Sequence, residues 1–424
     1  MNITILNGSK KNLSFDSYLE DLKQELRSLT HLVEILNLRD LNLRYCTGCF
    51  GCWVKTPGTC SNPDETARIL EAVINSDFTL WAAPLRMGYP GELLKRALDK
   101  SIPLIHPYFE VVQGEAHHRP RYQNYPRLGL LVEREDDTDQ QDLEITSWIL
   151  SRNALNMKSA LDFSLTTEVS PGELAERISQ PAEVSVSFPR DLGSTRGAEI
   201  TPPRSLTLFN GSPRGRKGNT PIMLNQFGEG FASALDRDCE LLHLNRLNDL
   251  EDQVQAFQEA DCVWLGFPLY TDAMPALVKR FIEALEPFKG RPENPPIGFL
   301  VQSGFPEALH SRYVERYLEK LADRLGSPYL GTIVKGGGEG VRMMPDGANR
   351  KLFTNLQGLG AGLAREGFLN PELLARVAGR ERYPGWMIPV MKALIKIPVY
   401  SWYWNSQLKK NGVFEKRFSQ PYQS

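Results

Sequence analysis

Four cysteines lie in one short stretch of the chain with the spacing Cys-x2-Cys-x2-Cys-x7-Cys: Cys46, Cys49, Cys52 and Cys60. Thiolates three residues apart in a loop can converge on one face of an iron–sulfur cube, and a fourth can close the site from a return turn at Pro57-Gly58. Zinc also accepts four thiolates, although structural zinc sites usually divide them into two separated pairs. The Cys-x-x-Cys steps also suit thiol–disulfide exchange. These cysteines are therefore candidate ligands of a [4Fe-4S] cluster, with zinc and unligated thiols left open.

A second candidate site follows the apolar run Leu206 to Phe209, where Asn210-Gly211-Ser212 begins a polar, glycine-rich stretch. Where a parallel strand turns into a helix, the first amides of the helix lack intrahelical partners and can bind an anion. The stretch from Gly211 to Thr220 supplies hydroxyls, an amide and cations at this place, and these groups suit a phosphate monoester. The stretch has neither the lysine spacing of a nucleotide-triphosphatase loop nor the three-glycine fingerprint of a dinucleotide fold.

A third feature is the segment Pro268-Leu269-Tyr270-Thr271-Asp272, which follows another apolar run and precedes a helix expected over Ala276 to Leu285. In an open parallel sheet, ligands bind outside the carboxyl ends of the strands, and the loop after the third strand meets the first loop there. We therefore expect this segment to share one site with the loop around Ser212.

The first half of the chain repeats this order. Asn7-Gly8-Ser9 also closes an apolar run, and Pro84-Leu85, followed by Leu93, Lys95 and Arg96, recurs at the same spacing as Pro268-Leu269, followed by Leu277, Lys279 and Arg280. Two copies of one fold are the economical interpretation. The cysteines fall in the longer connection of the first copy.

Apolar runs that can form buried parallel strands alternate with helical periodicity in both halves. These runs begin at residues 3, 32, 78 and 128 in the first half, and at residues 206, 239, 262, 297 and 329 in the second. Strand and helix in alternation predict a parallel sheet covered on both faces. The expected fold class is α/β, with two doubly wound parallel sheets in tandem.

The motifs of the second half resemble those of the flavodoxin-like NAD(P)H-dependent FMN reductases. The resemblance rests on Asn-Gly-Ser-Pro-Arg with a following Asn-Thr, and on Pro-Leu-Tyr ahead of Lys-x-Phe-Ile-Glu. It covers Asn2 to about Asn153 and again Leu206 to about Gly338. The cysteine spacing resembles that of iron–sulfur flavoproteins, a branch of the same group with a [4Fe-4S] cluster beside FMN.

The resemblance implies which residues contact FMN. In the second copy, Ser212, Arg214, Asn219 and Thr220 would hold the phosphate, and Pro268, Leu269, Tyr270 and Thr271 would line the ring. Ser303 and Gly304 would form the third flavin loop. In the first copy, Ser9 stands at the phosphate loop, and Pro84, Leu85 and Arg86 stand at the ring loop. This copy lacks the Pro-Arg and Asn-Thr pairs, and its third loop, residues 133–137, is acidic, so FMN binding there is left open.

The expected organisation is a flavodoxin-like domain with the cysteines at 1–180, a linker at 181–204, an FMN-binding domain at 205–370 and a C-terminal extension at 371–424. The extension is apolar and aromatic, but Pro389, Lys392, Lys396 and Pro398 interrupt it. A membrane-spanning helix needs about 20 predominantly apolar residues, so none is expected. The extension is expected to pack on the body or on a second subunit, with binding to a membrane surface as the alternative.

The chain of 424 residues is 41% hydrophobic and 24% charged, with a formal net charge of -2. This balance provides no basic field for nucleic acid. The N-terminus shows no signal peptide, and a cytoplasmic location is expected. The resemblance implies an NAD(P)H-dependent oxidoreductase that passes electrons through FMN to a quinone-like, nitro or iron–sulfur acceptor, in a chain that can be a homo-oligomer. An electron carrier, or a redox or iron sensor, is the alternative. No side chain is assigned as an acid or base, because hydride transfer to flavin needs none.

Overall fold

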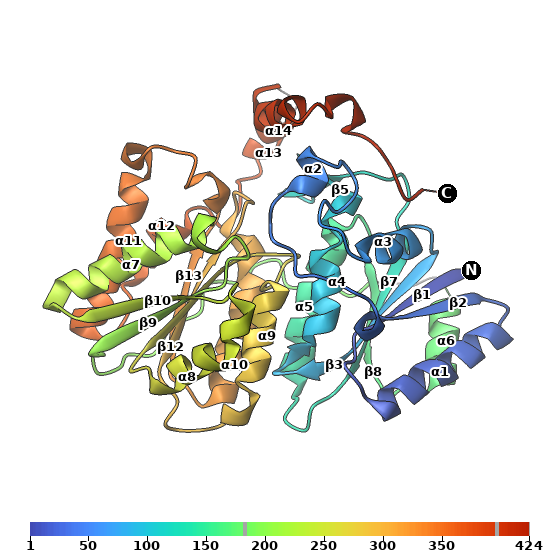
Figure 1. Ribbon diagram of the computed structural model, residues 1–424, viewed down its shortest axis with the longest axis horizontal. Helices are drawn as coiled ribbons and strands as arrows, with labels where there is room; N and C mark the ends of the chain where they lie inside the picture. The colour runs from blue at the N-terminus through green and yellow to red at the C-terminus, as the bar shows by residue number, and fades with distance from the viewer. Residues whose placement is uncertain (181–184, 395–397, 424) are drawn as a thin grey trace. The chain divides into compact units, whose positions relative to one another are not determined.

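The computed structural model describes residues 1–180, 185–394 and 398–423. The chain divides into two compact units, the first formed by Met1–Pro189 with Pro384–Ser424 and the second by Arg190–Tyr383. Each unit contains one parallel sheet with helices on both of its faces (Figure 1). The domain limits expected from the sequence remain predictions, and their residues 181–184, 395–397 and 424 lie outside the described part of the chain.

The sheet of unit 1 has the parallel strand order β2-β1-β3-β7-β8, with a short strand β4 antiparallel to β3. The first strand in sequence therefore lies inside the sheet, and the order reverses beside it, as in a doubly wound fold. The strands are β1 (Asn2–Asn7), β2 (Leu32–Asn37), β3 (Phe78–Arg86), β4 (Tyr89–Pro90), β7 (Arg127–Glu133) and β8 (Leu161–Thr166).

Helices cover this sheet because each buries one apolar stripe on it. In α1 the buried residues recur at helical spacing, and the side chain of the N-cap residue Asn12 accepts a hydrogen bond from the Phe15 amide at 3.2 Å. The helices of unit 1 are α1 (Leu13–Ser28), α2 (Gly51–Val54), α3 (Thr66–Ile74), α4 (Glu92–Asp99), α5 (Gln140–Asn156), α6 (Pro171–Ser179), α13 (Met387–Leu394) and α14 (Pro398–Lys410). A separate hairpin pairs β5 (Ile105–Val112) with β6 (Glu115–Pro120).

The sheet of unit 2 repeats the topology, with the parallel order β10-β9-β11-β12-β13. Its strands are β9 (Ser205–Asn210), β10 (Asp238–His243), β11 (Val263–Pro268), β12 (Ile297–Gln302) and β13 (Tyr329–Lys335). Its helices are α7 (Thr220–Leu235), α8 (Leu250–Glu259), α9 (Ala276–Ala284), α10 (Arg312–Leu325), α11 (Asp346–Glu366) and α12 (Pro371–Ala378). Two sheets of the same order confirm the expected fold class, two flavodoxin-like sheets in tandem.

Helix α11 packs along α7 on one face of the second sheet (Figure 1). Glycines make this close approach possible, because a Cβ atom at Gly360 would overlap the carbonyl oxygen of Phe227, and one at Gly230 would overlap that of Gln357. Phe227 and Trp264 are fully buried beneath the helix pair, with their ring centroids 4.5 Å apart. The carboxyl ends of the strands, where the predicted loops lie, are left uncovered by these helices.

In the described part of the chain, no helix is both long enough and apolar enough to cross a membrane.

Candidate functional site

The predicted phosphate loop of unit 2 connects β9 to α7 and is held by Asn210, the last residue of β9. The Asn210 side chain accepts a hydrogen bond from the Ser212 amide at 3.0 Å and donates one to the Gly215 carbonyl at 3.2 Å. Gly215 has a φ of 55°, which glycine adopts without strain. The N-cap residue Asn219 makes no side-chain capping bond to α7. The first amides of the helix therefore stay available to an anion at the carboxyl edge of the sheet.

An internal carboxylate already contacts this loop. Glu339, from the glycine-rich turn after β13, lies 2.8 Å from Arg214 Nη1 and 3.4 Å from Asn219 Nδ2, and Asn219 Nδ2 also donates to the Glu339 carbonyl at 3.1 Å. The Arg342 amide donates to Asn219 Oδ1 at 3.0 Å. Arg214 and Asn219 thus contact one anionic group of the chain itself, the Glu339 carboxylate.

Gln302 was missed by the sequence reasoning, although it joins three of the predicted loops. It ends β12, is 4% exposed, accepts from the Leu269 amide at 2.7 Å through its carbonyl, and donates from Nε2 to Thr220 Oγ1 at 3.5 Å. Its Oε1 atom is buried and has no hydrogen-bond partner among the described residues. A buried acceptor is normally satisfied, so a donor such as a ligand hydroxyl group fits this position. The sequence signal that could have identified Gln302 is its position directly before Ser303, a residue of the predicted third flavin loop.

The predicted ring loop of unit 2 forms a tight turn after β11. Tyr270 and Ala273 exchange backbone hydrogen bonds of 2.8 and 3.0 Å, and Thr271 and Asp272 both have positive φ, 44° and 61°. These angles are typical of a type I′ turn. The Leu269 amide donates to the carbonyl of Gln302, the last residue of β12, and the third loop begins directly after that residue. In that loop, Ser303 is fixed by backbone bonds to Lys335 and Gly338. The structure thus brings the second-copy residues to one edge of the sheet, and their roles toward FMN remain a prediction.

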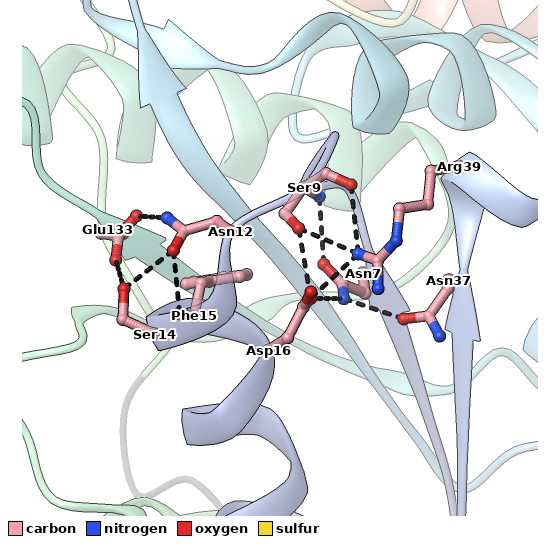
Figure 2. A network of polar contacts seen from close by, with 9 residues as sticks. All are labelled: Asn7, Ser9, Asn12, Ser14, Phe15, Asp16, Asn37, Arg39 and Glu133. Atoms are coloured by element: carbon pink, nitrogen blue, oxygen red, sulfur yellow. Dashed lines mark hydrogen bonds and ion pairs between the residues drawn. The ribbon is translucent and has the colours of Figure 1, made fainter.

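The corresponding loop of unit 1 is filled by its own side chains (Figure 2). Asn7 holds Ser9 as Asn210 holds Ser212, with a hydrogen bond of 3.0 Å from the Ser9 amide. The Asp16 carboxylate, from α1, accepts hydrogen bonds from Asn7 at 2.7 Å, Arg39 at 2.9 Å and Ser9 at 3.2 Å. Partial burial raises the pKa of Asp16, but these bonds and the Arg39 charge outweigh it and lower the pKa below its usual 3.8. Asp16 is therefore a bound anion at neutral pH.

The loop of unit 1 is also shorter. Only Lys10 and Lys11 separate Ser9 from the helix cap Asn12, whereas residues 213–218 separate Ser212 from the cap Asn219. The Pro-Arg-Gly turn of unit 2, which carries Arg214, has no counterpart in unit 1. The first copy thus has a shorter loop, and the guanidinium that reaches it, that of Arg39, is paired with the Asp16 carboxylate at 2.9 Å.

Two more carboxylates accept hydrogen bonds from the loops of unit 1. Glu133 ends β7 opposite Pro84, as Gln302 ends β12 opposite Pro268, and it accepts hydrogen bonds from Asn12 and Ser14 (Figure 2). Glu135 accepts hydrogen bonds from two backbone amides of the ring loop after Leu85 and Arg86, those of Met87 at 3.0 Å and Gly88 at 2.9 Å. Acidic side chains thus contact both predicted loops of the first copy, and FMN binding there remains open.

The four cysteines lie between β2 and α3, around the short helix α2. Cys49 is exposed and the other three are half-buried. Burial raises the pKa of Cys46 to about 12, and burial followed by the charges of Cys46, Cys49 and Cys60 raises the pKa of Cys52 well above its usual value. Each sulfur is therefore near enough to influence Cys52.

Lys100 supplies a cation to this loop, because its Nζ atom lies 3.2 Å from Cys60 Sγ and 2.7 Å from Asp64. Within residues 1–180, 185–394 and 398–423, no three cysteine, histidine or acidic side chains are arranged to hold one metal ion. Bound metal, whether a cluster or zinc, therefore remains a prediction for these cysteines.

Comparison with known proteins confirms the resemblance for the N-terminal region. Residues 1–111 match the family model described as NADPH-dependent FMN reductase. An iron-sulfur flavoprotein of Archaeoglobus fulgidus is 31% identical over 103 residues, which are 24% of this chain and 49% of that protein. The chain thus spans about half the length of the curated relative it matches.

Solved structures similar to part of the chain include two reductases. An FMN-dependent NADH-azoreductase of Bacillus anthracis, in complex with FMN, is 13% identical over 38% of this chain and all of its own, with a TM-score of 0.30. An NAD(P)H:quinone oxidoreductase of Methanothermobacter marburgensis is 17% identical over 39% of this chain and 99% of its own, with a TM-score of 0.31.

Proposed function

We propose that this chain is an FMN-dependent oxidoreductase that takes electrons from NAD(P)H and passes them to a small quinone-like or nitro acceptor, or to a metal centre at the cysteines. The observation that carries the proposal is the contrast between two equivalent loops. In unit 2 the loop after β9 presents Arg214 and Asn219 to the Glu339 carboxylate, whereas in unit 1 three carboxylates, those of Asp16, Glu133 and Glu135, accept hydrogen bonds from the loops. The similarity of residues 1–111 to an FMN reductase family supports the class of reaction.

The residues of unit 2 would bind and orient the cofactor. Arg214 and the first amides of α7 would pair with the phosphate in place of Glu339, which lies on a turn between glycines and is one-third exposed. Gln302 would accept a hydrogen bond from the sugar-alcohol chain, and the turn at Thr271 would hold the ring edge. When bound, FMN supplies the hydride and electron chemistry. The free cysteines fit the reducing conditions of the cytoplasm, where we place the protein.

The test is a visible spectrum of the freshly purified full-length protein, followed by titration with FMN and by steady-state oxidation of NADPH or NADH with an added quinone. We expect the protein to show flavin absorption and to oxidise NADPH or NADH when quinone is present. In the Arg214→Leu variant, loss of a charged hydrogen bond of about 1.5–3 kcal/mol should weaken FMN binding roughly ten- to a hundredfold. Arg350→Leu, at an exposed position of α11, is the matched control.

Two results would separate the competing functions. Protein that stays colourless after FMN addition contradicts the proposal. Protein that binds FMN but does not oxidise either nicotinamide supports an electron carrier in its place.

A further inference from the structure

The C-terminal segment, described over residues 384–394 and 398–423, belongs to unit 1 and packs on it. Helix α14 lies on α2, where the Trp404 ring stands edge-on to the Phe50 ring with a centroid distance of 5.2 Å (Figure 1). Leu408, four residues after Trp404, is buried. These two residues mark the inward face of α14, because residues four apart lie on the same face of a helix.

The chain after α14 is also held on unit 1. The guanidinium of Arg121 donates hydrogen bonds to the carbonyls of Ser419 at 2.9 Å and Arg417 at 3.2 Å. A Cβ atom at Gly58, where φ is 92°, would be 2.7 Å from Pro421 Cδ, so the last residues of the chain lie against the cysteine loop. These contacts fix the inner side of the segment.

The outward side of the segment carries large apolar side chains. Trp402 is 67% exposed, and it lies two residues before Trp404, which turns it away from α2. Trp386, directly before α13, is 74% exposed, and Val390, within α13, is 48% exposed. Phe418, beyond α14, is 55% exposed. Among the described residues, every exposed tryptophan or phenylalanine side chain lies in this segment.

Cations lie among these aromatic side chains. Residues 384–424 contain six lysine and arginine residues and one acidic residue, Glu415, whereas the rest of the chain is net negative. Lys409 comes seven residues after Trp402, so the two lie on the same face of α14, two turns apart. The outward side is therefore both aromatic and basic. The exposed lysines of the described segment are Lys392, Lys409, Lys410 and Lys416.

An anionic lipid surface fits this combination better than a second copy of the chain. In a dimer with two-fold symmetry the same patch contacts itself, which would bring the lysines of both copies together at a cost in free energy. Tryptophan is enriched at the boundary between lipid headgroups and acyl chains, and basic side chains attract anionic headgroups. Helices α13 and α14 have 8 and 13 residues, too few to span a bilayer, so the segment would lie on its surface.

We propose that the C-terminal segment binds the surface of a bilayer that contains anionic lipids. Trp386 and Trp402 enter the headgroup region, and Lys409 and Lys410 contact the anionic headgroups. The contacts of Trp404 hold α14 on unit 1 while the opposite face of the helix binds lipid. The inference goes beyond the proposed function and does not depend on FMN.

The test is co-sedimentation of the full-length protein with two kinds of vesicle, one of pure phosphatidylcholine and one with about a third of phosphatidylglycerol, which is anionic. We expect binding to the anionic vesicles and little binding to the neutral ones. Raising the ionic strength from about 0.1 to about 1 M shortens the Debye length from about 10 to about 3 Å, so it should weaken the binding at least about tenfold.

Two variants remove the two parts of the surface. Lys409→Gln combined with Lys410→Gln should weaken binding to anionic vesicles about thirtyfold, because each lysine near such a surface contributes roughly a factor of five. Trp402→Ala should weaken it about tenfold, because the variant lacks an apolar side chain that binding would bury. Lys351→Gln and Leu13→Ala, at exposed positions of α11 and α1, are the matched controls and should bind as the wild type does.

Equal binding by the wild type, the double lysine variant and Trp402→Ala would overturn the proposal, and so would a wild type that binds neither kind of vesicle. If one of the variants does not fold, the other decides. Dimerisation that Trp402→Ala abolishes, without vesicle binding, would assign the surface to a second copy and overturn the proposal too. FMN content is measured on the same protein, so failure here is distinguishable from failure of the flavin assignment.

Discussion

The two copies differ at one pair of equivalent residues, Glu133 in unit 1 and Gln302 in unit 2. Glu133 and Gln302 end equivalent strands and face equivalent prolines, but only the first is charged. At this position a carboxylate accepts hydrogen bonds from the loop, whereas the neutral amide keeps an unpaired acceptor for a ligand donor. The chemical difference is one oxygen against one amide nitrogen, and it changes the charge at the place where an anionic ligand would approach.

Exchanging these two residues gives a prediction at this scale. Gln302→Glu should weaken FMN binding by about fivefold to nearly a thousandfold, because a like charge near the phosphate loop costs on the order of 1–4 kcal/mol at the effective dielectric of a partly buried site. The measurement is an FMN titration followed by flavin fluorescence. Glu133→Gln should leave FMN binding unchanged, since Asp16 and Glu135 still hold the other donors. An unchanged affinity in Gln302→Glu, with the fold intact, would refute this role.

Sequence alone identified the loop residues but not their partners. Ser212, Arg214 and Asn219 were recognisable because they lie between an apolar run and the start of a helix. Asp16, Gln302 and Glu339 come from a helix, a strand end and a distant turn, and only the folded topology brings them to the same loops. The spacing of the cysteines was readable, but the cation beside them, Lys100 at 3.2 Å from Cys60 Sγ, comes 40 residues after Cys60 in the chain.

At the scale of elements, the predicted apolar runs are strands in the structure, because a strand buried on both faces is almost continuously apolar. Strand β8 and the hairpin of β5 and β6 were not expected. Strand β8 reads Leu-Asp-Phe-Ser-Leu-Thr and is an edge strand, so its alternating polar residues hide the pattern. The hairpin of β5 and β6 lies outside the parallel sheet, and the repeat of strand and helix gives no signal for it.

Helix α14 carries a prediction about stability. Trp404 packs on Phe50 and Trp53, so Trp404→Ala should lower the free energy of unfolding by about 1–2 kcal/mol, an amount in line with half-buried aromatic contacts. Trp402, on the same helix, is 67% exposed, and Trp402→Ala should change it by less than about 0.5 kcal/mol. Thermal unfolding of both full-length variants measures the difference. Equal losses would show that α14 does not hold its place through Trp404.

At the scale of the whole molecule, the chain combines two units with the same strand order but different side chains in the loops after the strands. The repeated motifs predicted two copies of one fold, and a duplication as the origin of the two units stays a prediction. The return of residues 384–424 to unit 1 was not readable, because the contacts of an apolar segment depend on which exposed surface accepts it.

This divergence predicts the cofactor content. We expect a single FMN per full-length chain, although two flavodoxin-like sheets are present, because Asp16, Glu133 and Glu135 occupy the first edge. The measurement is FMN released by denaturation, divided by the protein concentration from amino-acid analysis. The Arg214→Leu variant should release little FMN. A wild-type value near two, on the other hand, would mean that the carboxylates of unit 1 move aside for flavin.

Because unit 1 is discontinuous, its last part leaves the ribosome only after all of unit 2 has been made. During that interval the loop of Cys46 to Cys60 is exposed on one side, and Arg121 still lacks the carbonyl groups of Arg417 and Ser419. The contacts of α14 and Pro421 with the cysteine loop, at Phe50 and Gly58, can therefore form only after unit 2 has been synthesised.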